Sequence, residues 1–323
     1  MTRRLPLGWL FVAVVLVVLP ALLWLTGSAY GARLAQLVLI TALLAAALNL
    51  LIGTAGLLSL DTVVYYGFGA YLTAILSTKY GTTLPTEILA AAGAGALLGA
   101  LIGWPLVRLA SIFFAVATMG LATIFHTTVL NWGDLTRGPM GFRNIPSFRI
   151  GDWTAAGWAA NYYVIAVVVL AGIWIVHRLT HSFYGNAVRA VREDEDCARA
   201  MGLSPQRLKV QVYVTHAALM SVAGALYAHT NNFLSPDMFV MLESGLILTA
   251  VVVGGLGSLP GAFIGALVVV LVPEFLRPLG NLRAFGFGAI LFLSILFLPR
   301  GLFSEVKSLA AVRRHLFGQG WLR

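Results

Sequence analysis

The sequence predicts an all-α protein, a polytopic bundle of transmembrane helices. Three observations predict it: 59% of the 323 residues are hydrophobic, only 10% are charged, and the apolar residues gather in runs long enough to cross a bilayer. A soluble domain does not need so much apolar surface. The one strongly charged run, residues 182–202, interrupts the apolar segments. We therefore expect a water-exposed loop carried by a membrane-embedded bundle.

Apolar runs place the spans in chain order. The first covers 7–26, and we interpret it as a retained span because its apolar run exceeds that of a typical signal peptide. Further spans are expected at 34–52, 63–76, 85–107, 112–130, 162–179, from 205 onward, and at 285–298. Residues 244–277, broken at 254–261, are long enough for two short spans or a re-entrant hairpin. The bundle then has about ten crossings, or eight plus the hairpin.

The basic residues orient this bundle. If the N-terminus is cytoplasmic and residues 244–277 cross twice, fourteen of the 21 Lys and Arg residues lie inside and seven outside. This two-to-one bias obeys the positive-inside rule. We expect both termini and the loop 180–209 in the cytoplasm, and the loop 131–160 outside. The whole chain, 1–323, is then one transmembrane domain.

Small residues recur at four-residue intervals in two of the apolar segments. They are Gly95, Gly99 and Gly103 in one segment, and Gly261 and Gly265 in the other. Such spacing puts the glycines on one helix face, where they let a second helix approach closely. We interpret both sets as packing seams rather than hinges.

The charged loop has the spacing of a helix. Opposite charges stand four residues apart in three pairs: Arg189 and Glu193, Arg192 and Asp196, and Glu195 and Arg199. Apolar residues such as Ala198 leave a face able to dock, and Gly202 is a natural helix stop. Two interpretations stay open, a docking helix for another protein and a solvated surface helix held by local ion pairs.

Four polar residues near breaks in the apolar helices are candidates for a translocation path: Asn49, Ser59, Asp61 and Ser258. Ser59 and Ser258 lie in similar stretches, GLLSL and GLGSL, each followed by a glycine-rich helix start. Helix ends at such breaks offer dipoles and free backbone groups to a zwitterionic substrate. For Asp61 we expect a solvated helix N-cap, with an effect on substrate choice as the alternative.

The order Glu195-x-x-Ala198-x-x-x-Gly202 resembles the coupling motif of bacterial ABC importer permeases, and its surroundings resemble the LivM-type permeases of branched-chain amino acid importers. The resemblance covers roughly residues 40–300. It includes these segments: 56–60 with 67–71, Gly138 to Pro146, Ser235-Pro236, 254–258 and Pro273-Glu274. The chain departs from the family pattern at Leu57, Asp61 and Thr62.

This resemblance implies a permease subunit that passes branched-chain or related amino acids through the bacterial inner membrane without changing them chemically. It implies four kinds of partner: a second, LivH-like permease subunit, two cytoplasmic ATPases, an external binding protein and membrane lipid. It also implies that Arg189, Arg192 and Glu193, with the motif residues, meet the ATPases. The chain has no GxxxxGK[ST] loop, so we expect no cofactor on it and ATP on the partners.

Other functions remain as alternatives. The same architecture serves urea, short amides or aromatic acids in similar permeases, and an ion-coupled secondary transporter is a further possibility. An enzyme is not expected because the spans contain no convergent catalytic set. One cysteine excludes an internal disulfide and a cysteine metal cluster. The basic residues are scattered and form no stripe, so we expect no nucleic-acid partner.

Overall fold

The computed structural model describes residues 29–151, 153–155 and 157–282, and in addition positions 285, 286, 288, 289 and 292. Helices dominate these residues, and the strands are two residues long each. This confirms the predicted polytopic helical bundle. The predicted span 7–26, both chain ends and nearly all of the predicted span 285–298 lie outside the described residues. The number of crossings and the orientation of the termini therefore stay predictions.

Five helices within the described ranges are long and apolar enough to cross a membrane. They are α2 (Ala29–Asn49), α4 (Leu84–Leu106), α5 (Ser111–Asn131), α7 (Trp158–Thr180) and α10 (Pro205–Asn231). At about 1.5 Å per residue, these helices are roughly 30–40 Å long. A sixth long helix, α3 (Thr62–Tyr80), packs against α4 and α10. Each helix overlaps a span that the apolar runs predict.

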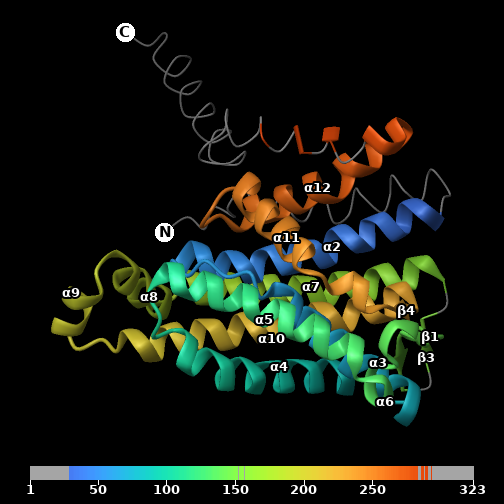
Figure 1. The fold of residues 1–323 in the computed structure, drawn as a ribbon, viewed down its shortest axis with the longest axis horizontal. Helices are drawn as coiled ribbons and strands as arrows, with labels where there is room; N and C mark the ends of the chain where they lie inside the picture. Colours follow the sequence, from blue (N-terminus) through green and yellow to red (C-terminus); the bar gives the residue numbers. More distant parts are fainter. Residues whose placement is uncertain are drawn as a thin grey trace, which may run out of the picture.

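The central helix of the bundle is α10, which packs against α2, α3 and α4 (Figure 1). A Cβ added to Gly99 of α4 would lie 2.5 Å from the Cβ of Ala217 on α10. Gly95 and Gly103, one turn to either side, face α10 just as closely. The two helices therefore touch along a stripe where only glycine hydrogens intervene, a type of contact common between membrane helices.

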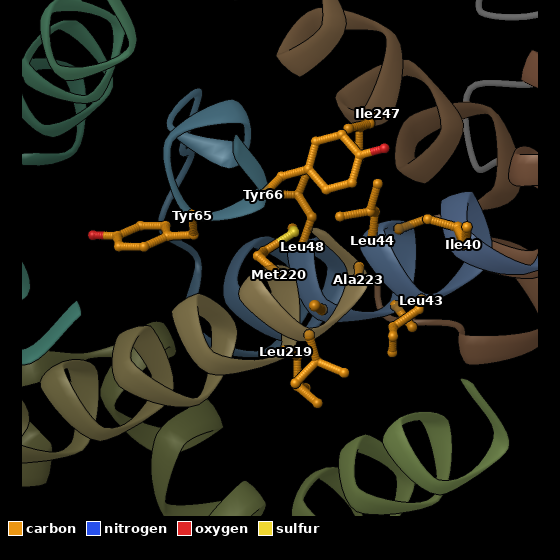
Figure 2. Close-up of a cluster of buried hydrophobic side chains, with 14 of the residues drawn as sticks. Ile40, Leu43, Leu44, Leu48, Tyr65, Tyr66, Leu219, Met220, Ala223 and Ile247 are labelled. Carbon is orange, nitrogen blue, oxygen red and sulfur yellow. The ribbon is translucent and has the colours of Figure 1, made fainter. Parts of the chain in front are cut away.

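The apolar core lies where α2, α3, α10 and α11 meet. Figure 2 shows this cluster, with Leu44 and Leu48 of α2, Tyr66 of α3, and Met220 of α10 among its members. Ile247 joins it from α11 (Met241–Gly254). Close packing of these side chains holds together helices that lie far apart in the sequence. Such packing is a main attractive force between helices inside a lipid bilayer.

The predicted segment 244–277 forms an antiparallel hairpin of α11 and α12 (Leu259–Phe275). Gly261 faces the backbone of Gly254, and Gly265 faces the backbone of Ala250, so the two helices nearly touch. With 14 and 17 residues, the helices are about 21 and 26 Å long. Each is shorter than the roughly 30 Å hydrocarbon core of a bilayer.

The two ends of the bundle carry different connections (Figure 1). One end carries α6 (Gly133–Thr136), η2 (Gly138–Met140), β1 (Phe142–Arg143), β2 (Arg149–Ile150), β3 (Trp153–Thr154), β4 (Phe233–Leu234) and η3 (Pro236–Phe239). β1 pairs antiparallel with β4, and β2 with β3. The loop 131–160 is thereby joined to the segment that follows α10. Beyond α12, the described chain continues as η4 (Arg277–Leu282).

The other end carries the charged loop, which folds as α8 (Phe183–Glu193) and α9 (Glu195–Ala200). The prediction of one continuous helix was wrong. Asp194 is extended, with φ −154° and ψ 113°, and its side chain accepts hydrogen bonds from the backbone of Asp196 and Cys197. Aspartate competes well for this capping position, so it starts a second helix instead of continuing the first.

The break at Asp194 also changes the ion pairs of the loop. Glu195 and Arg199 lie 3.7 Å apart, as their spacing predicts. Arg192 and Asp196 stand on different helices, and the guanidinium of Arg192 instead binds a carbonyl of the bundle. Arg189 donates to the carbonyl of Thr180 rather than to its predicted partner.

Candidate functional site

A hydrogen bond connects the charged loop to the core of the bundle. Arg192 Nη1 donates to the carbonyl oxygen of Gly53 at 2.5 Å. Gly53 lies in η1 (Leu50–Thr54), a π-helical turn that ends α2. Gly56, at φ +72°, gives room to the Arg192 side chain, whose Cγ would lie 2.9 Å from an added Cβ. Single π-helical turns are frequent at functional sites.

The same end of α2 holds the tip of the α11–α12 hairpin. Asn49 Oδ1 accepts from the backbone N–H of Gly257 at 2.8 Å, and its Nδ2 donates to the carbonyl of Ser258 at 3.0 Å. Asn49 is buried, and both polar ends of its amide are used. The charged loop, the end of α2 and the hairpin tip therefore form one connected unit. We name this unit, from Arg192 through Gly53 and Asn49 to residues 257–258, the coupling junction.

A second polar cluster surrounds Asp61, which is fully buried. Ser59 donates to Asp61 Oδ1, and Tyr213 of α10 donates to Asp61 Oδ2. Tyr65 points its hydroxyl out of the apolar core (Figure 2) and donates to the Tyr213 hydroxyl at 2.9 Å. The expectation of a solvated N-cap was wrong: Asp61 stands before α3, but its carboxylate makes no capping bond to that helix. The tertiary fold supplies donors from α10 in place of water.

His216 links this cluster to α2. Its Nδ1 lies 3.1 Å from the carbonyl oxygen of Ala47, and its Nε2 lies 3.7 Å from Asp61 Oδ1. Because a carbonyl oxygen only accepts, Nδ1 carries a hydrogen, and Nε2 is the nitrogen that faces the carboxylate. Asp61 therefore lies among Ser59 and two residues of α10, Tyr213 and His216, and His216 connects this cluster to α2.

The four candidate path residues thus fall into two groups. Asn49 and Ser258 meet in the coupling junction, and Ser59 and Asp61 meet in the Asp61 cluster. Ser59 is fully buried, whereas Ser258 is half-buried and caps α12 by accepting from the Gly261 N–H. His216 connects the two groups through α2, since its partner Ala47 precedes Asn49 by two residues.

The candidate coupling residues lie on or beside the two short helices of the loop. Ala198 is buried, whereas Arg189 and Glu193 are exposed. Glu195 forms an ion pair with Lys209 at the start of α10. Gly202 has φ +85°, and nothing lies within 4 Å of an added Cβ. The loop therefore presents a charged surface on a backbone tied to the bundle.

Electrostatics distinguish two side chains of this loop. Backbone hydrogen bonds, first from the N–H of Cys197, lower the pKa of the Asp194 carboxyl. The Cys197 thiol is exposed, and its hydrogen bond to Asp194 together with the nearby negative charge raises its pKa. The thiol is therefore accessible to reagents but less readily ionised than an isolated cysteine.

Sequence reasoning missed a buried pair of titratable side chains, Glu87 and His229, at the opposite end of the bundle. Glu87 Oε2 of α4 lies 2.7 Å from His229 Nε2 of α10, and His229 Nδ1 lies 2.7 Å from the carbonyl of Pro146. The pair fastens the loop 131–160 to the transmembrane helices. Tyr213 and His216 were missed as well. A signal was available, because titratable residues inside apolar spans are expensive unless they have partners.

Comparison with known proteins finds a matching family over most of the chain. Residues 30–298 match the family described as "Branched-chain amino acid transport system / permease component". The LivM permease protein of the high-affinity branched-chain amino acid transport system of Escherichia coli (strain K12) is 32% identical over 296 residues, covering 83% of this chain and 69% of LivM.

Two further relatives belong to the same kind of transport system. LivM of Salmonella typhimurium is also 32% identical over 296 residues, with the same coverage. LivH of Escherichia coli (strain K12), a permease protein of the same system, is 26% identical over 250 residues, or 71% of this chain and 79% of LivH. No solved structure matches the chain.

Proposed function

This chain belongs to the family of branched-chain amino acid transport system permease components, and from that premise we propose the following function. It is one of two permease subunits of an ATP-driven importer in the bacterial inner membrane. The importer passes branched-chain or related amino acids into the cytoplasm by alternating access. The observation that carries the proposal is the coupling junction, because it connects the charged loop, where the ATPases would bind, to the end of α2 and to the tip of the α11–α12 hairpin.

The ATPases dock on the loop 180–209, chiefly on α8 and α9. When they close on ATP, α8 moves, and Arg192 transfers the displacement to the end of α2. Asn49 transfers it onward to the hairpin tip at residues 257–258. Asn49 is buried, so breaking its hydrogen bonds would leave polar groups unpaired, and this part of the junction is expected to move as one unit. The bundle then exchanges its outward-open arrangement for an inward-open one, and the substrate passes unchanged.

The partners follow from the family and from the surfaces of the chain. The second permease subunit is LivH-like, which agrees with the similarity of this chain to both LivM and LivH. Two ATPase subunits supply ATP hydrolysis, since no phosphate-binding loop occurs in the sequence. A soluble protein delivers the substrate to the end that carries loop 131–160. Lipid covers apolar faces such as that of Leu89, Leu97 and Leu101 on α4.

The test is uptake by the assembled importer. The chain is purified with its second permease subunit and ATPases, placed in vesicles, and supplied with the binding protein and a panel of amino acids, urea and short amides. We expect uptake of branched-chain amino acids that stops without ATP and continues in the presence of an uncoupler. Uptake of urea or amides alone would show that the importer carries the alternative cargo and not branched-chain amino acids. Uptake that an uncoupler abolishes would identify an ion-coupled transporter instead.

A further inference from the structure

The corner where α7 meets α8 contains a cavity that neither the coupling junction nor the Asp61 cluster uses. Its volume is about 360 Å³, and its lining consists of His177, Arg178, His181 and Ser182. Three of these four side chains are basic, and none is a carboxylate. Cavities of several hundred Å³ with a few convergent polar groups are typical of ligand sites. The lining of this one matches a ligand with negative charge.

The Arg178 guanidinium is available to such a ligand. Its side chain is exposed, and among the described residues no hydrogen bond or ion pair engages it. The sequence has no aspartate or glutamate from residue 153 to residue 192, so α7 carries no carboxylate. Arg189 of α8 donates to the carbonyl of Thr180 at 3.0 Å and adds a second positive charge at this end of α7. Within the described residues, the corner therefore has two arginines and no carboxylate paired with either.

The two histidines of the lining are held in an arrangement that supports the same ligand. His177 and His181 stand one helical turn apart, with ring centroids 4.2 Å from each other. His181 Nδ1 lies 3.0 Å from the carbonyl oxygen of His177, so Nδ1 carries a hydrogen and Nε2 is the nitrogen left for a ligand. When the ring is protonated, Nε2 donates as well. His181 can then add a charge-assisted hydrogen bond beside that of Arg178.

An exposed apolar strip on α7 leads to the cavity. Tyr163, Val167 and Trp174 are exposed, and their spacing of four and seven residues puts them on one side of the helix, which Arg178 continues one turn later. Phe183, the first residue of α8, is 90% exposed. With 23 residues, α7 is about 35 Å long, so its end lies near the headgroups of a bilayer with a hydrocarbon core of about 30 Å. Tryptophan is typical of this boundary.

We propose that the α7–α8 corner binds the phosphate of an anionic membrane lipid. Arg178, His177 and His181 surround the headgroup, and the exposed strip of α7 lies along the acyl chains. Free inorganic phosphate offers the same charge without chains, and the exposed rings of Trp174 and Phe183 favour the lipid as the source. The inference goes beyond the proposed function, because it holds for any cargo. It gives the charged loop a lipid site at its base, where α8 begins.

The experiment uses the complete importer in phosphatidylcholine vesicles that contain a small amount of phosphatidylglycerol with a photoactivatable group near its headgroup. After illumination, mass spectrometry identifies the labelled peptides. We expect labelling of residues 174–183 that excess unlabelled phosphatidylglycerol displaces and excess inorganic phosphate does not. Labelling that inorganic phosphate displaces equally well would overturn the lipid as the ligand.

Arg178→Gln tests the charge of the site. We expect labelling of residues 174–183 to fall about fivefold or more, which is the preference that one basic residue gives to an anionic lipid. The matched control is Arg207→Gln, which removes the same charge from an exposed arginine in the first turn of α10 and should leave the labelling unchanged. Equal labelling of Arg178→Gln and the wild type would overturn the inference.

If Arg178→Gln does not assemble, two lipids decide on the wild-type importer. Phosphatidylcholine with the same photoactivatable group carries an ammonium that the arginine repels, so it should label residues 174–183 several-fold less than phosphatidylglycerol does. Equal labelling by the two lipids would reject the site. These measurements report binding and not uptake. A failed lipid site therefore leaves the proposed function standing, and an importer that moves no amino acid leaves the lipid site standing.

Discussion

Arg192 donates a hydrogen bond to the carbonyl oxygen of Gly53, 139 residues earlier in the chain, at 2.5 Å. The other bonds of the charged loop to the described bundle go to α7 and α10, the two helices that it connects. Arg192 therefore gives this loop its direct link to α2. Asn49, four residues before Gly53, extends that link to the hairpin tip.

Replacing Arg192 tests this link. Arg192→Ala removes a charge-assisted hydrogen bond worth about 1.5–3 kcal/mol, so we expect ATP-driven uptake to fall roughly tenfold or more. ATP hydrolysis measured beside uptake separates the two roles of Arg192: it continues if only the link to Gly53 is lost, and it falls as well if Arg192 also contacts the ATPases. Reconstituted vesicles give both rates. Arg199→Ala is the control, since its ion pairs with Glu195 and Asp196 are exposed and contribute little. Equal uptake by both variants would contradict the role of the link.

The donors to Asp61 make a stability prediction. Tyr213→Phe leaves the buried carboxylate without one of its hydroxyl donors, which costs about 1–3 kcal/mol. We expect the melting temperature of the purified protein in detergent to fall by several degrees. Tyr163→Phe makes the same chemical change at an exposed position of α7 and should have no effect. A Tyr213→Phe protein that melts with the wild type would show that Asp61 does not need this donor.

The glycine stripe of α4 offers an internally controlled test. Gly99→Ala places a methyl group 2.5 Å from the Cβ of Ala217, closer than carbon atoms approach, so α4 and α10 must separate. Gly93→Ala adds the same group where nothing lies within 4 Å, and alanine favours a helix by about 1 kcal/mol. We expect thermal unfolding in detergent to show destabilisation for the first variant only. Destabilisation by Gly93→Ala but not by Gly99→Ala would contradict the close packing of α4 against α10 along this stripe.

Cys197 reports the topology of the loop. Its side chain is exposed, so a membrane-impermeant maleimide reaches it from whichever side carries the charged loop. The positive-inside bias predicts the cytoplasmic side. We expect labelling in inverted membrane vesicles and none in intact cells, with Cys197→Ser as the blank. Added ATPase should slow the reaction. Labelling of intact cells would place the charged loop outside.

The rate of that labelling should depend on pH in a defined direction. The hydrogen bond to Asp194 and its negative charge raise the pKa of the Cys197 thiol, and the thiolate is the reactive form. The wild-type rate should therefore rise at higher pH than for an isolated cysteine. Asp194→Asn keeps an N-capping oxygen but removes the charge, so its rate profile should shift to lower pH. An unshifted profile would show that Asp194 does not control the thiol.

Much of the fold followed from local patterns. The spans 34–52, 85–107 and 112–130 were predicted within a few residues, because each apolar run must satisfy its own backbone hydrogen bonds as a helix. Gly95, Gly99 and Gly103 stand on one face through helix periodicity alone, and that face lies against α10. The prediction of a continuous helix through Asp194 was wrong, because it used only the spacing of opposite charges and left out the tendency of aspartate to cap and start a helix.

By itself, the sequence determined a helical membrane protein, the positions of its long helices and its resemblance to amino acid permeases, because apolar length and periodicity are local properties. The partners of its buried polar groups were decided only by the tertiary structure. Asp61 binds Tyr213 rather than water, and Arg192 binds the carbonyl of Gly53 rather than Asp196. A buried polar group takes whichever donor or acceptor the packing of distant helices brings to it, and no local pattern contains that information.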